Sequence, residues 1–310
     1  MTFLLLESLH PDATRELESA ATVKLATGSD DALAIGRAEP VEAIIGRALE
    51  FVGAELMDAC APTLRAVARA GSGMDTIDVE AARTRGLALV SAPGVNARAT
   101  AEHALMLALA SARQVVELDR AVRVGEWRSA RERWPTYELH GRTLGVVGLG
   151  EAGRRTAELG AGLGMRVVYW SRSSRDGRFE LQELGDLLRC ADVVTVHLAV
   201  SEETVGLIGP AELAEMRPTA HLVNVARGKI VDEHAVAVAL REGRLGGYAT
   251  DVLTCEPPNL GHPLLTAPRT VITPHSAALG ERTYREVCLY CVRNLLALLH
   301  GGEVDPAALT

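Results

Sequence analysis

Short runs of apolar residues alternate with amphipathic stretches along almost the whole chain. Each run is nearly continuous in Val, Ile, Leu and Ala, which is typical of strands covered on both faces. Eleven runs predict strands: FLLL, VKLA, AIIG, LRAVA, LALVS, TLGVVG, RVVYW, VVTVHL, HLVNVA, YATDV and TVITP. The repeated strand–helix pattern predicts an α/β fold with two doubly wound parallel-sheet domains.

Two long helical stretches interrupt this pattern. One is expected over residues 98–124, without internal Gly or Pro, followed by a loop that contains Trp127 and Trp134; the other is expected over residues 279–300. A long helix before the later strands and another after them suggest that the first domain is discontinuous, with a cleft between the domains. The predicted division is a first domain of residues 1–96 plus 280–310 and an inserted domain of residues 97–279.

Composition narrows the class of protein. The chain has 310 residues, 48% of them hydrophobic and 23% charged, as in a soluble globular protein with well-buried cores. The net charge of −8 and the lack of a basic stripe argue against nucleic-acid or anionic-membrane partners. The start MTFLLLES has no basic region, and the most apolar segment, 99–112, is too short to span a bilayer. We therefore expect a cytoplasmic protein.

The five cysteines are not expected to form a framework of disulfide bonds. An odd number in a large chain argues against structural disulfides. Cys288 and Cys291 have CxxC spacing, but no second pair of ligands lies nearby in the sequence. We expect both to be buried in a helix, and we expect no metal site.

A glycine-rich turn is the strongest local signal. The strand 143–147 runs into GLGEAG and then a helix. The first glycine permits a tight turn, the second lets the backbone approach a pyrophosphate, and the third lets helix and strand pack closely. The candidate cofactor-binding residues are Gly148, Gly150, Glu151, Ala152 and Gly153. A methyltransferase site, or a turn that binds nothing, is the alternative.

Several further motifs resemble one family. RAGSGMDTID, SAPGVNARATAEHAL, GLGEAG, HLVNVARGKIVDEHAV, GYATDVLTCEPP, HPLL and VITPHSA follow one another over nearly the whole chain. Together they resemble the D-isomer-specific 2-hydroxyacid dehydrogenases, which include glyoxylate/hydroxypyruvate reductases and 3-phosphoglycerate dehydrogenase. The resemblance implies a flavodoxin-like substrate domain, a Rossmann dinucleotide-binding domain, an NAD(P)-dependent oxidoreductase acting on the CH–OH group of 2-hydroxy acids, and a homodimer.

The resemblance also implies three catalytic residues, Arg227, Glu256 and His275. Reduction of a 2-keto acid needs a proton for the developing alkoxide, and imidazolium is a suitable donor near neutral pH. A neighbouring carboxylate, Glu256, would favour the charged form of His275. The planar guanidinium of Arg227 can bind the substrate carboxylate and polarise the ketone.

Other contacts follow from the same resemblance. The backbone of Gly71, Ser72 and Gly73 would form a small anion nest for the substrate carboxylate; a plain turn is the alternative. Further implied cofactor contacts are Thr100, Val225 and Asp251, the last beside the nicotinamide amide. The remaining histidines, among them His103, His197 and His262, are interpreted mainly as structural, although His197 could face the cofactor.

The segment after RVVYW bears on the choice of cofactor. An acidic residue is expected there when the adenosine ribose of NAD is bound, but Ser171, Arg172 and Ser173 occupy the position, and no carboxylate follows until Asp176. Hydroxyl and guanidinium groups favour a 2′-phosphate, so we expect NADP to be preferred over NAD. The alternative is a solvated charged turn with relaxed cofactor choice.

The substrate is expected to be a small 2-keto or 2-hydroxy acid such as glyoxylate or hydroxypyruvate. No appended regulatory domain is expected after Thr310, unlike in longer phosphoglycerate dehydrogenases. A phosphoglycerate or phosphite dehydrogenase-like enzyme is one alternative, and a dinucleotide-sensing binding protein is another. ALMLALA, within the helix 98–124, is the expected dimer interface, unless it packs between the domains of one chain.

Overall fold

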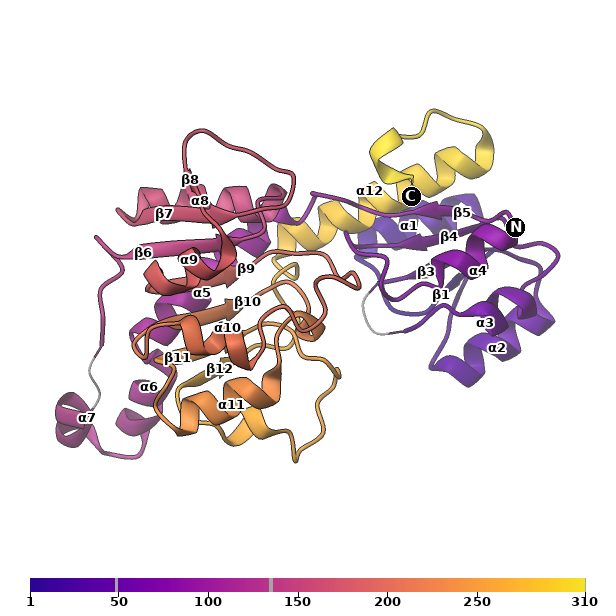
Figure 1. Cartoon of the computed structure of the whole chain (residues 1–310). Coiled ribbons are helices and arrows are strands. Elements are labelled where there is room, and N and C mark those ends of the chain that lie inside the picture. The colour runs from indigo at the N-terminus through magenta and orange to yellow at the C-terminus, as the bar shows by residue number, and fades with distance from the viewer. Residues whose placement is uncertain (48–49, 134–135, 310) are drawn as a thin grey trace. The chain divides into compact units, whose positions relative to one another are not determined.

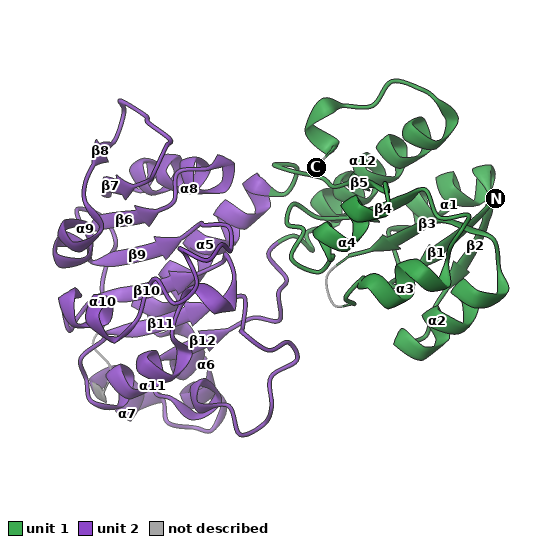
Figure 2. Ribbon diagram, turned by 45° about the vertical axis from the view of Figure 1, so that its right-hand side comes forward, with its two compact units in different colours: residues 1–96, 278–310 green, residues 97–277 purple. Residues whose placement is uncertain are grey.

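The chain forms two compact α/β units. This computed structural model describes residues 1–47, 50–133 and 136–309. Unit 1 comprises residues 1–96 and 278–310, and unit 2 comprises residues 97–277 (Figures 1 and 2). Each unit holds one sheet, and the named strands pair in parallel within each of the two sheets. The predicted fold class is therefore confirmed.

Unit 1 has the strand order β2-β1-β3-β4-β5, which is the flavodoxin-like order. Its strands are β1 (Thr2–Leu5), β2 (Thr22–Leu25), β3 (Val41–Gly46), β4 (Ala66–Arg69) and β5 (Ala88–Val90). Its helices are α1 (Pro11–Ala20), α2 (Ser29–Ala38), α3 (Ala54–Ala59), α4 (Val79–Thr84) and α12 (Glu281–His300), with a 3₁₀ turn η3 (Pro306–Ala308). Alternate strand residues bury on opposite faces: Phe3 packs with α1 and α12, and Leu4 packs with α2 and α3.

The helix α12 returns the chain to unit 1. Its residues Cys288 and Cys291 are both fully buried free thiols against the sheet, as expected for an apolar helix face. The predicted helix 279–300 is thus observed, beginning two residues later at Glu281.

Unit 2 has the strand order β12-β11-β10-β9-β6-β7-β8, in which the order reverses beside β6 as in a Rossmann sheet. Its strands are β6 (Thr143–Val147), β7 (Arg166–Trp170), β8 (Glu180–Leu181), β9 (Val193–Val196), β10 (His221–Asn224), β11 (Gly247–Thr250) and β12 (Thr270–Ile272). Its helices are α5 (Ala97–Ala112), α6 (Val115–Arg123), α7 (Trp127–Arg133), α8 (Glu151–Gly162), α9 (Leu184–Cys190), α10 (Pro210–Glu215) and α11 (Glu233–Arg241), with 3₁₀ turns η1 (Gly228–Ile230) and η2 (Pro263–Thr266).

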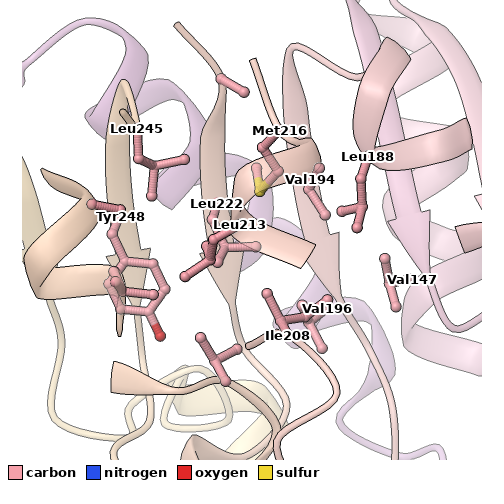
Figure 3. Packing of buried hydrophobic residues seen from close by; sticks show 14 of the residues in the cluster. Val147, Leu188, Val194, Val196, Ile208, Leu213, Met216, Leu222, Leu245 and Tyr248 are labelled. Carbon is pink, nitrogen blue, oxygen red and sulfur yellow. The ribbon is translucent and has the colours of Figure 1, made fainter. Parts of the chain in front are cut away.

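Two apolar layers sandwich this second sheet. Val194 and Val196 point to the layer formed with α9, α10 and α11 (Figure 3). Val193, which alternates with them, packs in the other layer with α5 and α8. Burial on both faces explains why the strands read as continuous apolar runs in the sequence.

The predicted long helix 98–124 is wrong in one respect. It is divided into α5 and α6 at Gln114, which adopts a left-handed conformation with φ of 48°. The carbonyl of Ala112 accepts a hydrogen bond from the Tyr137 N–H at 3.1 Å, so a distant segment takes the place of the next helical turn. Trp127 begins a short helix rather than lying in a loop, and Trp134 lies outside the described residues.

Candidate active site

Three neighbouring strands of unit 2 deliver the predicted catalytic residues. Arg227 follows β10, Glu256 follows β11 and His275 follows β12. The carboxyl ends of parallel strands lie at one edge of a sheet, and ligands of open α/β sheets bind beyond that edge. The glycine turn after β6 lies at the same edge. Topology thus gathers residues that are up to 127 positions apart in the sequence.

His275 and Glu256 form a hydrogen-bonded pair. The distance from His275 Nδ1 to Glu256 Oε2 is 2.7 Å, and the other carboxylate oxygen, Oε1, accepts from the Leu253 N–H at 2.8 Å. Burial raises the pKa of Glu256, but its hydrogen bond to His275 and the charge of that ring outweigh burial and hold the pKa below its ordinary value. The carboxylate therefore stays ionised near neutral pH and orients the ring, with Nε2 on the opposite side.

Asp251 anchors the backbone of His275 and of the two residues that follow it. Its Oδ1 accepts from the Ser276 N–H at 2.9 Å, and its Oδ2 accepts from the Ala277 N–H at 2.9 Å. Its own carbonyl accepts from the His275 N–H at 2.8 Å. Burial would raise the pKa of Asp251, yet hydrogen bonds from His103, Thr273 and these backbone groups lower it to about 2. The side chain is therefore a buried anion that shapes the loop carrying His275.

Arg227 is held through its backbone by Asn224, a fully buried residue at the end of β10. Asn224 Nδ2 donates to the Arg227 carbonyl at 2.9 Å, and Asn224 Oδ1 accepts from the Ala226 N–H at 3.0 Å. Gly228 then passes so close to the next loop that a Cβ would lie 2.1 Å from the Leu253 carbonyl carbon. Sequence reasoning missed Asn224; its only signal was its place within the NVARG motif.

A second buried carboxylate supports the Glu256 loop. Glu233, 7% exposed, accepts from the Thr254 N–H at 2.8 Å through Oε1 and pairs with His262 Nε2 at 2.9 Å through Oε2. The carboxylate thereby fixes the chain two residues before Glu256. The contact of His262 with Glu233 could be located only in the fold because the two residues are 29 positions apart.

The glycine turn fits a dinucleotide. Gly148 has φ of 99°, and a Cβ at Gly153 would lie 2.0 Å from the Gly148 carbonyl oxygen, so neither position accepts a side chain. A Cβ at Gly150 would enter open space, and as the N-cap of α8 this residue forms no side-chain cap. The first N–H groups of α8, at Glu151 and Ala152, are thus available to phosphate oxygens.

His197 lies directly beside this turn. Its carbonyl oxygen would be 2.6 Å from a Cβ at Gly148, and its Nε2 is 2.9 Å from Thr195 Oγ1. Burial lowers the pKa of His197 to about 3. The ring is therefore neutral at physiological pH and packs against the turn.

The segment after β7 carries hydroxyl and guanidinium groups, and its first acidic residue, Asp176, is paired with an arginine. Ser171 Oγ accepts from the Ser174 N–H at 3.1 Å, and Arg172 forms an ion pair with Glu203 in the loop after β9. Asp176, the first carboxylate after the strand, pairs with Arg178, whose hydrogen bonds lower the Asp176 pKa to about 2. Glu203 is a residue near the cofactor position that sequence reasoning did not identify.

The remaining predicted residues are distributed between the two units. Val225 is buried directly after β10, Thr100 lies in the first turn of α5, and Ser173 follows Arg172. In unit 1, Ser72 Oγ donates to Asn96 Oδ1 at 2.7 Å, and the Gly71 N–H is donated to the Arg69 carbonyl at 2.8 Å. An anion at residues 71–73 would therefore compete with an internal bond for one of the three N–H groups.

The described residues contain neither a candidate metal cluster nor a candidate membrane-spanning helix. Across residues 1–47, 50–133 and 136–309, no cluster of three or more His, Cys, Asp or Glu side chains could hold a metal ion. Within the same part of the chain, no helix has the length and hydropathy needed to cross a membrane.

Comparison with known proteins agrees with this geometry. The D-isomer specific 2-hydroxyacid dehydrogenase NAD binding domain matches residues 105–277. A glyoxylate reductase of Aeropyrum pernix is 43% identical over 256 residues, covering 79% of this chain and 76% of the relative. A D-3-phosphoglycerate dehydrogenase of Archaeoglobus fulgidus is 37% identical over 92% of this chain, but the match spans only 54% of that relative.

A solved structure agrees over the full length. The NADPH-dependent glyoxylate/hydroxypyruvate reductase of Sinorhizobium meliloti, in complex with NADP and malonate, superposes with a TM-score of 0.89 and 28% identity, covering 100% of this chain and 96% of that one. The family domain thus matches more than half of the chain, and the relatives match most of it at more than 30% identity. The chain belongs to the D-isomer specific 2-hydroxyacid dehydrogenases and is an oxidoreductase that uses a nicotinamide dinucleotide.

Proposed function

We propose that the chain reduces small 2-keto acids, with glyoxylate and hydroxypyruvate as substrates and NADPH as the preferred cofactor. The observation that carries this proposal is the 2.7 Å pair between His275 and Glu256 at the carboxyl edge of a dinucleotide-binding sheet. That pair supplies an oriented proton donor beside the place where a dinucleotide fits. Relatives named glyoxylate reductase support the substrate.

Each residue has a separate task in this proposal. The bound nicotinamide supplies or accepts the hydride. His275 Nε2 donates a proton to the developing alkoxide, and Glu256 holds the ring through Nδ1. Arg227 binds the substrate carboxylate and polarises the ketone oxygen with its planar fork of donors. Residues Gly71, Ser72 and Gly73 are our candidates for N–H donors to a substrate carboxylate.

The preference for NADPH rests on the segment after β7. Ser171, Arg172 and Ser173 offer hydroxyl and guanidinium donors that suit a 2′-phosphate. Asp176, which could hold a ribose, is committed to Arg178. The Sinorhizobium meliloti relative was solved with NADP, which supports the same choice.

Two other functions are outcomes of the same test. The phosphoglycerate dehydrogenase relative favours a phosphorylated 2-hydroxy acid as the second candidate substrate. A dinucleotide-sensing protein would bind cofactor without turnover.

Initial rates test the proposal. NADPH and NADH are compared by absorbance loss at 340 nm with glyoxylate and with hydroxypyruvate, and 3-phosphoglycerate is tested with NAD and NADP. We expect turnover of a small keto acid with kcat/KM at least tenfold higher for NADPH, which corresponds to about 1.4 kcal/mol. We expect His275→Asn to lose roughly 10²- to 10⁴-fold in kcat, the usual contribution of a general acid.

Each contrary result has one meaning. A preference for NADH would reject the cofactor proposal and retain the reaction. If 3-phosphoglycerate were turned over and neither keto acid were, the proposed substrate would be wrong and the phosphorylated acid would take its place. If the folded protein binds NADPH by calorimetry but reduces no keto acid, the proposed substrates are rejected. That result would favour the dinucleotide-sensing protein.

We also propose that the enzyme is a homodimer. On α5 of unit 2, Met106 is 42% exposed and Leu109 is 37% exposed, and both line a shallow apolar hollow together with Val115 and Leu159. Exposed apolar surface of this kind is typical of an interface between subunits.

A further inference from the structure

His103, on the second turn of α5, is partly buried against the loop that carries His275. Its side chain is 15% exposed. Its Nε2 lies 2.9 Å from Thr273 Oγ1 and 3.2 Å from Asp251 Oδ1. The histidine therefore joins a helix of one face of the sheet to the two residues that shape the catalytic loop.

The direction of these hydrogen bonds can be assigned from donors and acceptors. Asp251 is an ionised carboxylate and can only accept, and Thr273 Oγ1 lies 2.5 Å from its Oδ1. The single hydroxyl hydrogen of Thr273 is therefore donated to Asp251. Thr273 Oγ1 can then only accept from His103, so Nε2 of His103 must carry a hydrogen.

The chain of donors ends at the backbone of the catalytic loop. Asp251 accepts from the N–H groups of Ser276 and Ala277, directly after His275. His275 itself has φ of 52°, a left-handed conformation that a residue with a Cβ rarely adopts unless its surroundings impose it. A donor that fixes Asp251 and Thr273 thus helps to impose the conformation of His275.

We propose that His103 is a positioning residue: its Nε2–H, acting through Thr273 and Asp251, holds the backbone that presents His275 to the substrate. This inference rests on the proposed role of His275 as the proton donor. It assigns a place in the reaction to a helix residue that lies 172 positions before the residue it positions.

The experiment compares two replacements of His103. His103→Leu removes the donor, whereas His103→Gln keeps an N–H donor on a side chain of similar reach. We expect His103→Leu to lower kcat at least tenfold with the KM for NADPH within about threefold, and His103→Gln to retain at least a third of kcat. Because Thr273 lies in the same chain of bonds, we expect Thr273→Val to lower kcat as well. We expect the double variant, His103→Leu with Thr273→Val, to have a kcat no lower than that of the more impaired single variant.

A buried histidine in contact with the same helix provides the control. His221, 4% exposed, bonds through Nδ1 to Ser111 Oγ on the same helix, α5, but at the amino end of β10, away from the catalytic edge. His221→Leu removes a comparable buried contact with α5. We expect it to lower the melting temperature while leaving kcat within twofold.

Three results would overturn the proposal. One is a folded His103→Leu enzyme whose kcat is within twofold of the natural enzyme. Another is His103→Gln as impaired as His103→Leu, which would mean that the N–H is not what matters. The third is an equal loss of kcat in His221→Leu, which would indicate a general effect of loosening α5. If His275→Asn retained full kcat, the proposed proton donor would fail instead, and that variant is measured in parallel.

Discussion

At the scale of single residues, His275, our proposed proton donor, has a costly backbone conformation. A left-handed residue with a Cβ costs about 1–2 kcal/mol relative to the right-handed form. His275 has φ of 52°, and the hydrogen bonds that Asp251 accepts from Ser276 and Ala277 offset the cost of this conformation. Function and stability are therefore linked at one buried carboxylate.

The pH dependence of stability should reveal this link. The folded-state pKa of Asp251 is depressed to about 2, so its contribution is complete above the ordinary pKa near 4 and is lost as pH falls through about 2. The shift corresponds to about 2 kcal/mol. We expect the difference in unfolding free energy between the natural enzyme and Asp251→Asn, measured with urea, to fall by about 1 kcal/mol between pH 6 and pH 3. A difference independent of pH would contradict the assignment.

Glu203 should weaken the affinity for a 2′-phosphate. Its carboxylate pairs with the Arg172 guanidinium, so a bound 2′-phosphate must compete with it. Exposed ion pairs are weak, so we expect Glu203→Gln to raise the affinity for NADP by only about two- to fivefold and to leave NAD unchanged, measured by calorimetry at low salt.

The control is the neighbouring Glu202→Gln. It removes the same charge but leaves the ion pair between Arg172 and Glu203 in place. Equal gains in the two variants would mean that net charge, and not the pairing, sets the affinity.

At the scale of elements, the contact between α8 and the glycine turn is the tightest constraint on the cofactor site. Gly153 on the helix faces the Gly148 carbonyl oxygen, which a Cβ would approach to 2.0 Å. Backbone is on both sides of this contact, so no side chain can move aside. The close approach is what aligns the helix N-terminus with the strand end.

Gly153→Ala should therefore displace α8 from the turn. We expect NADPH binding by calorimetry to weaken more than tenfold and the melting temperature to fall. Gly162→Ala, in the last turn of the same helix, is the matched control because its Cβ would meet nothing within 4 Å. It should bind NADPH normally and change stability by no more than about 1 kcal/mol. Normal NADPH affinity in Gly153→Ala would show that this contact is dispensable.

At the scale of the whole molecule, each unit is a complete three-layer α/β fold with apolar clusters on both faces of its sheet. Such a unit can fold around its own core. The apolar hollow on α5 of unit 2 is part of the apolar surface that these clusters leave exposed.

Charge introduced on that hollow should dissociate the proposed dimer. We expect the natural chain to elute with a light-scattering mass near twice 33.0 kDa, and Met106→Glu combined with Leu109→Glu to shift it toward the single-chain mass. Leu181→Glu is the control, since Leu181 is 43% exposed on β8. A natural chain that is monomeric at micromolar concentration would reject the dimer.

Much of the architecture could be predicted from the pattern of apolar runs. Each of the eleven predicted strands overlaps a strand of the structure. For the buried strands the reason is that burial on both faces requires a continuous apolar run. The strand β8, with two exposed residues, was not predicted, since it exists only through its pairing with β7. The break at Gln114 was missed because it has neither Gly nor Pro and depends on the distant Tyr137.

By itself, the sequence determined the fold class, the family and the glycine turn, because these depend on local periodicity and on motifs of contiguous residues. Only the tertiary structure decided which side chains support them. The links from His103 to Thr273, from Glu233 to His262 and from Arg172 to Glu203 join residues 29 to 170 positions apart. Hydrogen bonds and ion pairs act over a few ångströms of space, and the order of strands in a sheet, which no local pattern encodes, sets which residues come within that reach.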